Sequence, residues 1–306
     1  MEKYFVRENL IKIIREFFYT QEFHEVITPV LNTALPLEPN LRPFTTTHKY
    51  KNRKQTFYLA MSPERGLKKM LAAGMGNCFS LTPSFRNYEL VGSLHFHEFI
   101  MLEWYRKNAV YTDIMEDIEV LLKLICKQMK NTKIIVNKPF PCLSLNDLFE
   151  EKIGKKLEFL IADKEQLWKI AEKKGYKIEK KTTWHQLFDQ LFVNEIEPTF
   201  SSQPFFLTDF PACISPLCKK KGENPLLAER FELYINRVEI ANGNTENTDT
   251  KSIRTVFEKE HKKTGMPIDE EFLSWLELMK NNSYAGVGIG IDRLAMFFDL
   301  RKNYCP

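Results

Sequence analysis

The sequence predicts an α+β fold in which helices flank one antiparallel β-sheet. Strand-like segments at 78–106 and 230–242 follow one another through loops or a hairpin, as antiparallel strands do. Amphipathic helical segments lie outside these strand pairs, and no repeat, low-complexity linker or clean boundary divides the 306 residues. We therefore expect residues 1–306 to form a single domain with a helical insertion at about 144–195.

Composition and charge argue against several classes of protein. The formal charge of +4 is small, and the lysine clusters at 173–181 and 219–221 are typical of solvated surface, not of a dedicated nucleic-acid binder. No apolar run approaches the roughly 18 residues of a membrane span, and the N-terminus has no signal-peptide pattern. The six cysteines are scattered without a CxxC pair, which indicates reduced thiols in a cytoplasmic protein.

The first part of the chain predicts helix, strand, loop and strand in turn. Residues 5–19 form an amphipathic helix whose apolar face is Val6, Leu10, Ile13, Ile14, Phe17 and Phe18. Residues 24–29 predict a strand stopped by its proline, and residues 56–60 a second strand. The polar stretch at 32–55 between them indicates an irregular flap or connecting loop.

A well-bounded helix follows, and the rest of the chain completes the sheet. Ser62 is expected to cap this helix, Pro63 suits its first position, Glu64 suits its first turn and Gly74 ends it. Further helices are expected at 112–130, 145–153, 163–174, 183–194, 248–263, 269–280 and from 291. Further strands are expected at 205–209, 230–233, 238–242 and 284–290.

The strand pair within 78–106 combines core residues with charged ones. With a period of two, one face of its second strand carries Phe99, Met101, Glu103 and Tyr105, while the other face is plain core. Arg86 lies on the preceding strand. A cation, an aromatic platform and a buried acid on neighbouring strands predict a site for a ligand that is anionic at one end and cationic at the other.

Residues 286–293, Gly-Val-Gly-Ile-Gly-Ile-Asp-Arg, form a glycine-rich strand-to-helix turn. A dinucleotide-binding fingerprint would need a following βαβ unit and an acidic residue about 20 positions later, whereas only residues 291–306 remain. We expect the glycines to let a flat group lie on the strand, with Arg293 reaching a phosphate. Close strand packing beside a surface arginine is the alternative.

A carboxylate pair, Glu232 and Glu239, lies on the predicted hairpin at 230–242. Such hard oxygen ligands suit Mg²⁺ that bridges nucleotide phosphates, although hairpin glutamates are usually solvated. His95 and His97 lack the further ligands of a zinc site. No Ser/His/Asp or Cys/His nucleophile motif and no Walker loop is present in the sequence.

In combination these motifs resemble motifs 1, 2 and 3 of the class II aminoacyl-tRNA synthetases. The corresponding segments are Glu25…Thr28-Pro29, Phe85-Arg86-Asn87…Glu98-Phe99 and Gly286–Arg293. Ser62-Pro63-Glu64 and the runs 98–105 and 230–243 are similar to the lysyl branch, and most of all to its elongation factor P lysine ligases. The resemblance covers nearly the whole chain. It implies the class II antiparallel sheet flanked by helices, and we expect no anticodon-binding domain.

The resemblance also implies roles for individual residues. The catalytic cations would be Arg86 at the α-phosphate of ATP and Arg293 at the γ-phosphate. Further ATP contacts would be Asn87, Tyr88, Phe96, Phe99, Glu232, Leu233 and Gly290, with Mg²⁺ on Glu232 and Glu239. The amino-acid pocket would be formed by Ser62, Pro63, Glu64, Glu103, Tyr105, Glu239, Asn242 and Gly288, with Glu103 and Tyr105 at the side-chain amine.

The activity so implied is ATP-dependent adenylation of lysine or β-lysine, followed by transfer to a lysine side chain of elongation factor P. The protein would align the reactants and neutralise charge. A truncated lysyl-tRNA synthetase-like enzyme acylating tRNA or a small molecule is the alternative, and a catalytically idle paralogue that binds a partner is the third. We expect a homodimer through helix 5–19 and the strand ending at Pro29, and we do not expect tRNA as the partner.

Three departures from the family pattern affect these expectations. Tyr88 stands where an acid usually follows Arg-Asn, and residues 94–98 replace a usual His-Asn-Pro-Glu. Gly288 is the glycine of lysyl-tRNA synthetases, where the protein ligases carry alanine. A missing methyl group widens a pocket and changes discrimination by about 1–3 kcal/mol. The preference between α-lysine and β-lysine is therefore open.

Overall fold

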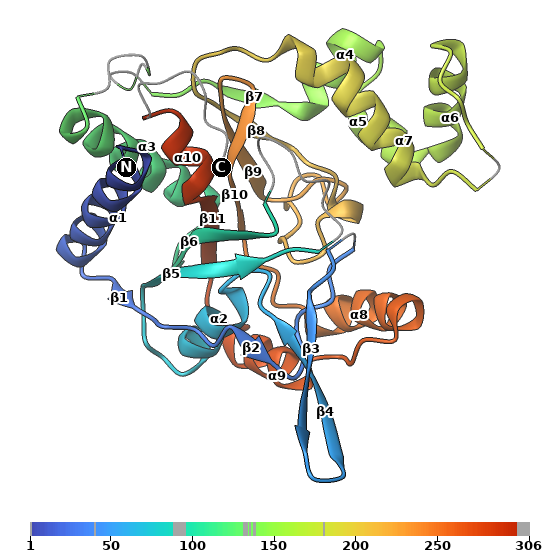
Figure 1. Ribbon diagram of the computed structural model, residues 1–306. Helices are drawn as coiled ribbons and strands as arrows, with labels where there is room; N and C mark the ends of the chain where they lie inside the picture. Colours follow the sequence, from blue (N-terminus) through green and yellow to red (C-terminus); the bar gives the residue numbers. More distant parts are fainter. Residues whose placement is uncertain are drawn as a thin grey trace.

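A mixed eight-stranded sheet, ordered β1-β5-β6-β11-β10-β9-β8-β7, forms the centre of the molecule (Figure 1). The computed structural model describes residues 2–39, 41–87, 96–130, 134, 136, 139–179 and 181–298. The strands are β1 (His24–Glu25), β5 (Cys78–Phe85), β6 (Glu98–Lys107), β7 (Cys142–Ser144), β8 (Phe205–Thr208), β9 (Arg230–Ile235), β10 (Val238–Thr245) and β11 (Tyr284–Gly290). The α+β class is confirmed. Strands β5 to β8 pair antiparallel in that spatial order, whereas the edge pairs β1–β5 and β7–β8 are parallel.

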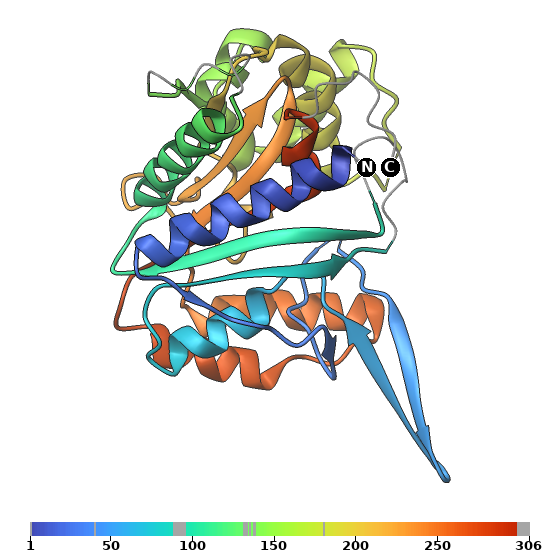
Figure 2. The ribbon, with the colours of Figure 1, turned by 60° about the vertical axis from the view of Figure 1, so that its left-hand side comes forward.

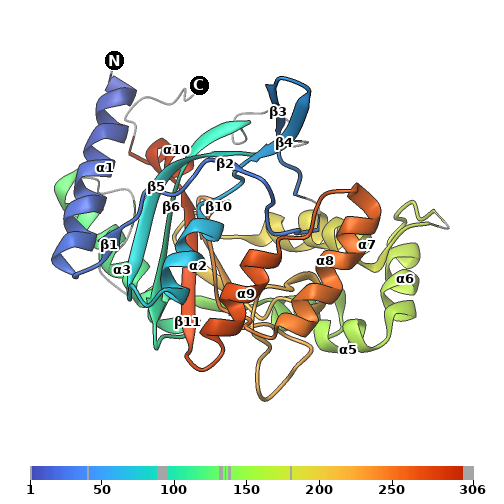
Figure 3. The same cartoon turned by 90° about the horizontal axis from the view of Figure 1, so that it is seen from below.

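Two groups of helices cover the two faces of the sheet (Figures 1, 2 and 3). One group is α1 (Glu2–Thr20), α3 (Tyr111–Gln128) and α10 (Ile291–Met296), and the other is α2 (Glu64–Ala72), α8 (Thr250–Thr264) and α9 (Glu270–Met279). The first group shares a core with Phe79 and Trp104, and the second packs around Phe257, Phe272 and Tyr105. Among the residues described, no helix is long and apolar enough to cross a membrane.

The expected helical insertion lies between β7 and β8 and forms one end of the molecule (Figure 1). Its helices are α4 (Leu145–Ile153), α5 (Leu157–Ala162), α6 (Lys164–Lys173) and α7 (Trp184–Leu191), followed by a π-helical turn (Phe192–Ile196) and a 3₁₀ turn (Glu197–Thr199). They share an apolar core with Phe205 and Leu207 of β8. The sequence did not predict α5, because its six residues are too few to show a helical period.

The prediction of an irregular loop at 32–55 is wrong. A small sheet ordered β2-β4-β3 is formed there by β2 (Leu31–Asn32), β3 (Thr45–Tyr50) and β4 (Arg53–Leu59). The β3–β4 hairpin projects from the body of the molecule (Figure 2). Every residue of β3 and the first four of β4 are exposed, so these strands carry no apolar alternation for a sequence pattern to reveal.

Most other predicted elements agree with the structure to within a few residues, and β11 matches the predicted range. The strand expected at 24–29 is reduced to β1. Pro63, not Ser62, occupies the N-cap position of α2, although the Ser62 hydroxyl still accepts a hydrogen bond from the Glu64 N–H at 3.3 Å. The helix start was therefore predicted one residue too early.

Candidate active site

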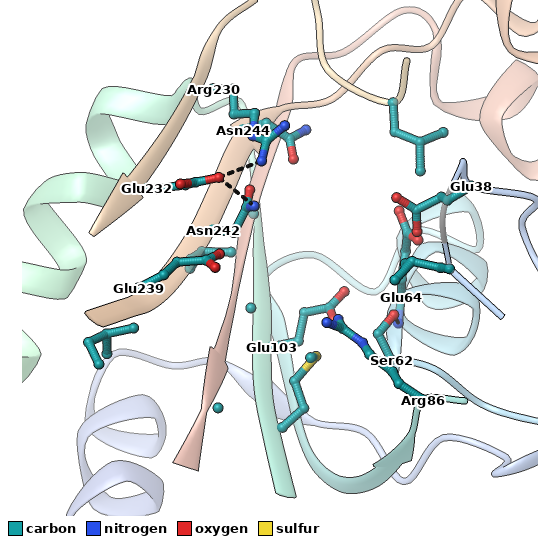
Figure 4. Close-up of a pocket in the computed structure, with 18 of the residues that line it drawn as sticks. Glu38, Ser62, Glu64, Arg86, Glu103, Arg230, Glu232, Glu239, Asn242 and Asn244 are labelled. Atoms are coloured by element: carbon teal, nitrogen blue, oxygen red, sulfur yellow. Dashed lines mark hydrogen bonds and ion pairs between the residues drawn. The ribbon is translucent and has the colours of Figure 1, made fainter. Parts of the chain in front are cut away.

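A cavity of about 420 Å³ opens on the face of the sheet formed by β6, β10 and β11, facing the start of α2 (Figure 4). Its lining brings together residues from widely separated parts of the sequence. The predicted site residues that line it are Ser62, Glu64, Arg86, Phe96, Phe99, Glu103, Tyr105, Glu232, Glu239, Asn242, Gly288, Gly290 and Arg293.

The other predicted residues fall elsewhere. Pro63 is buried at the start of α2 and does not line the cavity. Asn87 pairs through its backbone with Arg42 and also lies outside the lining. The side chain of Leu233 is fully buried in the core, because it alternates with Glu232, which takes the cavity face. Tyr88 lies outside the described residues, as do residues 94 and 95 of the unusual loop.

Strand β6 supplies one wall of the cavity with the alternation that the sequence predicted. Phe99, Met101, Glu103 and Tyr105 line the cavity, whereas Trp104 belongs to the core behind the sheet. The Tyr105 hydroxyl donates a hydrogen bond of 2.6 Å to Glu103. Burial, helped by repulsion from a neighbouring carboxylate, raises the pKa of Glu103 to about 8. A cationic ligand would therefore meet a carboxyl group that becomes an anion when the cation binds.

The two predicted phosphate-binding arginines reach the cavity from different elements. The Arg86 guanidinium lies over the Phe99 ring, 5.4 Å from its centroid, and Nε donates to the Met61 carbonyl at 3.5 Å. Arg293, on α10, donates from Nη1 to the carbonyl oxygen of Glu239 at 3.2 Å. Fixed cations of this kind suit the binding of an anionic polyphosphate.

Asp292 anchors the helix that carries Arg293. Its Oδ2 accepts the Ile100 N–H at 2.8 Å, which ties the first turn of α10 to β6. Oδ1 lies 3.4 Å from Arg7 of α1. Asp292 belongs to the glycine-rich motif at 286–293, but no role was predicted for it from the sequence. The structure indicates that it positions Arg293 and Gly290 against the neighbouring strand.

Glu232 of the carboxylate pair on β9 and β10 is buried beside Arg230, whereas Glu239 is only half-buried. Arg230 and Asn242 donate hydrogen bonds to the same carboxylate oxygen of Glu232, at 2.5 and 3.3 Å (Figure 4). The Tyr234 hydroxyl donates to the other oxygen of Glu232 at 2.7 Å. Burial, with repulsion from Glu239, raises the pKa of Glu232 to about 7. A divalent cation would relieve this repulsion.

The donor set decides which kind of metal site fits here. Within the described ranges, no group of three or more His, Cys, Asp or Glu is suited to hold a metal ion by itself. Glu232 and Glu239 therefore fit Mg²⁺ only together with oxygens of another ligand, as Mg²⁺ bound through one or two carboxylates and nucleotide phosphates requires.

A buried lysine organises the acidic side of the cavity. Lys68 of α2 lies 2.5 Å from Glu64 and 2.6 Å from Glu246. Burial would lower the pKa of Lys68, but the two carboxylates raise it above its usual value. Burial also raises the pKa of Glu246 to about 7 despite this lysine. Neither Lys68 nor Glu246 was predicted as a site residue; the only sequence signal is the helical i, i+4 spacing of Glu64 and Lys68.

The three glycines of β11 serve different purposes. A Cβ on Gly286 would lie 2.2 Å from the Tyr105 ring and 2.8 Å from the Trp104 carbonyl. A Cβ on Gly288 would meet its nearest neighbour, Met101 Sδ, at 3.4 Å, and one on Gly290 would meet only Arg293, at 3.9 Å. Close packing therefore requires glycine at 286 alone, whereas the other two leave room in the cavity.

The fold and the cavity place the chain in a known class. The family model described as tRNA synthetases class II (D, K and N) matches residues 1–303, so the chain belongs to this family and is an ATP-dependent ligase. The chain is similar to the elongation factor P–(R)-β-lysine ligase homolog of Aquifex aeolicus (strain VF5). The two are 32% identical over 295 residues, which cover 96% of this chain and 93% of the relative.

Lysine–tRNA ligases have a similar sequence identity to the chain, but the match covers a smaller share of their own length. Those of Aquifex aeolicus (strain VF5) and Pasteurella multocida (strain Pm70) are both 34% identical to the chain, over 307 and 311 residues. Each match covers 96% of this chain. It covers 50% of the first ligase and 61% of the second.

Proposed function

We propose that the protein activates lysine or β-lysine with ATP and transfers the aminoacyl group to a lysine side chain of elongation factor P. The observation that supports this most is the lining of one cavity, which combines Arg86, Arg293 and Phe99 with the acidic residues Glu64 and Glu103. A lysine-type substrate has the matching charges. The similarity to the elongation factor P ligase homolog, which extends over nearly the whole of both chains, supports the choice of acceptor.

In the first step, a carboxylate oxygen of the substrate attacks the α-phosphorus of ATP. The new bond replaces the bond to the bridging oxygen, and pyrophosphate leaves with that electron pair. Arg86 and Arg293 would hold the phosphates and stabilise the charge that develops on them, while Phe99 would support the adenine. Glu232 and Glu239 would hold Mg²⁺, which supplies further neutralisation of the phosphate charge when bound.

In the second step, the acceptor amine attacks the carbonyl carbon of the aminoacyl-adenylate, AMP leaves and the amine loses a proton. The substrate side-chain ammonium would be bound by Glu103 and Tyr105, whose carboxyl and hydroxyl groups already form a 2.6 Å hydrogen bond. Binding a cation there lowers the pKa of Glu103 from about 8, so a proton is released. The protein contributes alignment and electrostatic stabilisation in both steps.

The acceptor assignment is tested by protein mass. The enzyme is incubated with ATP, Mg²⁺, elongation factor P and either L-α-lysine or (R)-β-lysine. The mass of intact elongation factor P is then measured by mass spectrometry. We expect a mass increase of one aminoacyl group that depends on ATP and is abolished by Arg293→Ala. Adenylate formation in the same mixture without added mass on elongation factor P would contradict this acceptor.

Aminoacylation of tRNA is the second candidate function. Gly288 favours it, because lysyl-tRNA synthetases are expected to carry glycine there, and the lysine–tRNA ligases are similar to the chain. Acid-gel analysis of total tRNA after incubation with lysine and ATP tests it. Charging that falls steeply with added salt would support tRNA as the acceptor.

We also propose that the protein is a cytoplasmic homodimer with one catalytic domain per chain. Large apolar side chains are exposed along α1 and the segment that follows it, namely Tyr4, Phe5, Tyr19, Ile27 and Leu31. Ile27 is 95% exposed. Such a patch supports burial against a second copy of the chain.

A further inference from the structure

One carboxylate in the cavity has no role in the function proposed so far. Glu38 lies in the segment between β2 and β3 and lines the cavity together with Glu64 and Glu103. Figure 4 shows the carboxylate groups of Glu38 and Glu64 side by side. The two residues come from different elements, because Glu64 begins α2. No sequence pattern marks Glu38, which stands in an irregular, proline-flanked stretch.

Glu38 lacks a partner that would explain its position. It forms no hydrogen bond or ion pair with any residue in the described part of the chain. Its surroundings are unfavourable for an anion, since burial and repulsion from Glu64 raise the pKa of Glu38 to about 7. A carboxylate held in this way costs stability unless a cation joins it.

The charges of Arg86, Lys68 and Arg230 favour the anionic form of Glu38, but within the described part of the chain none of the three forms an ion pair with it, and Arg86 lies over the Phe99 ring. Lys68 lies between Glu64 and Glu246 at 2.5 and 2.6 Å, and Arg230 is paired with Glu232 at 2.5 Å. Glu38, Glu64 and Glu103 thus line the cavity, while the buried Lys68 of α2 is shared between Glu64 and the buried Glu246 behind them. The excess of negative charge suits a ligand with more than one ammonium group.

A lysine-type amino acid has two ammonium groups, and the proposed function uses only one of them at Glu103 and Tyr105. We propose that Glu38 is a specificity-determining residue that, together with Glu64, binds the substrate amino group nearer the carboxylate. This inference rests on the proposed function and deepens it. Glu38 thereby selects diamino acids over ω-amino acids that lack this second amino group. The position of its carboxylate also determines which carbon of the substrate, α or β, can carry that amino group.

The test compares ligands with and without that amino group. Wild type, Glu38→Gln and the control Glu223→Gln, which alters an exposed glutamate outside the cavity, are assayed by ATP–pyrophosphate exchange. The KM is measured for L-α-lysine and (R)-β-lysine. The inhibition constant of 6-aminohexanoate, which has only the terminal amine, is measured against lysine in each variant.

We expect Glu38→Gln to raise the KM of the preferred lysine about 10- to 100-fold, the range for losing a hydrogen bond to a charged group. The inhibition constant of 6-aminohexanoate should stay within about twofold of wild type, and Glu223→Gln should change neither value. Urea unfolding of Glu38→Gln should show undiminished stability, because the substitution removes repulsion from Glu64. A purely structural role would lower stability instead.

The outcomes separate the two proposals. An unchanged KM for lysine in Glu38→Gln, or equal weakening of lysine and 6-aminohexanoate, would overturn the role of Glu38 while leaving lysine activation intact. Wild-type protein that shows no exchange with either lysine would overturn the proposed function, and the assignment of Glu38 with it.

Discussion

Gly286 and Gly288 lie two residues apart on β11 but meet different neighbours. An alanine substitution should therefore change substrate discrimination at 288 and stability at 286. In Gly288→Ala the new Cβ would lie 3.4 Å from Met101 Sδ and 3.8 Å from Glu103 Oε2, which is ordinary contact. We expect unchanged thermal stability and a shift of about 1–3 kcal/mol in discrimination between α-lysine and β-lysine, because the methyl group narrows the substrate end. Exchange kinetics with both lysines measure this shift.

Gly286→Ala is the matched control. Its Cβ would lie 2.2 Å from the Tyr105 ring, so overpacking should destabilise the fold by about 1–3 kcal/mol in urea unfolding. Equal stability losses in both variants would mean that position 288 is also filled, and the account of an open substrate pocket there would be wrong.

Lys68 binds the buried carboxylate of Glu246 and the partly buried carboxylate of Glu64, and its removal should be costly. In Lys68→Met, Glu64 and Glu246 lose the cation that lies 2.5 and 2.6 Å away. We expect the free energy of unfolding to fall by about 3–5 kcal/mol, as for breaking one side of a buried ion pair. Lys69→Met removes an exposed neighbour and should change stability by less than about 0.5 kcal/mol. Similar urea midpoints for the two variants would contradict the structural role of Lys68.

At the scale of residues, the sequence predicted side chains whose place follows from a periodic strand and missed those placed by tertiary packing. The cavity face of β6 follows from a period of two, and Glu103 and Tyr105 were predicted correctly to share it. Arg230, Glu246 and Glu38 were missed, because their approach to the cavity depends on strand pairing and on an irregular segment that local patterns do not describe. The roles of individual residues follow from the resemblance to a family and not from periodicity.

At the scale of elements, α10 should depend on its attachment to β6. Asp292→Ala removes the acceptor of the Ile100 N–H, a bond of 2.8 Å. We expect a loss of about 1–3 kcal/mol in unfolding free energy and a fall in kcat, because Arg293 on the same helix turn is no longer held in place. Urea unfolding and steady-state exchange assays measure the two effects.

Arg7→Ala provides the comparison for this element. Arg7 contacts the same carboxylate at 3.4 Å, but its side chain is 36% exposed, so we expect a change below about 1 kcal/mol. If Arg7→Ala and Asp292→Ala weaken activity equally, then the contact with β6 is not what positions α10.

The elements that the sequence predicted correctly have one buried face, and the ones it missed do not. Helix α1 buries Leu10, Ile14 and Phe18 at helical spacing and was predicted within a few residues. The β3–β4 hairpin is exposed along most of its length, so its pairing is set by the backbone and leaves no hydrophobic pattern. Prediction from sequence therefore succeeds where burial and periodicity coincide.

At the scale of the whole molecule, the acidic side of the cavity should make stability fall as pH rises. The folded protein has raised carboxyl pKa values of about 8 for Glu103 and about 7 for Glu38, Glu232 and Glu246, against about 4.3 for an unfolded chain. Between these limits the native state binds more protons than the unfolded state, so unfolding free energy decreases with pH.

Glu103→Gln tests this linkage, because it removes the group with the highest of these pKa values. We expect its unfolding free energy to depend less on pH than that of wild type between about pH 5 and 8. Urea unfolding at several pH values gives both slopes. Parallel slopes would show that Glu103 is ionised in the folded protein and is not a proton-releasing partner for a cation.

The proposed dimer makes a second prediction at this scale. Ile27→Asp places a charge on a side chain that is 95% exposed in the single chain, so folding should be unaffected while self-association is lost. Light scattering coupled to gel filtration should give a dimer for wild type and a monomer for the variant. A dimeric Ile27→Asp protein would exclude this patch as the interface.

The central claim is that the cavity activates a lysine-type amino acid, and ATP–pyrophosphate exchange tests it most directly. Wild-type protein is supplied with ATP, Mg²⁺ and, in separate reactions, L-α-lysine, (R)-β-lysine, aspartate or asparagine. Aspartate and asparagine are included because the family model covers the tRNA synthetases for aspartate, lysine and asparagine. Glu64 and Glu103, which line the cavity, should favour a cationic side chain, so we predict exchange with a lysine at least about 100-fold above that with aspartate or asparagine. Exchange driven by aspartate or asparagine, or by no amino acid, would contradict the account.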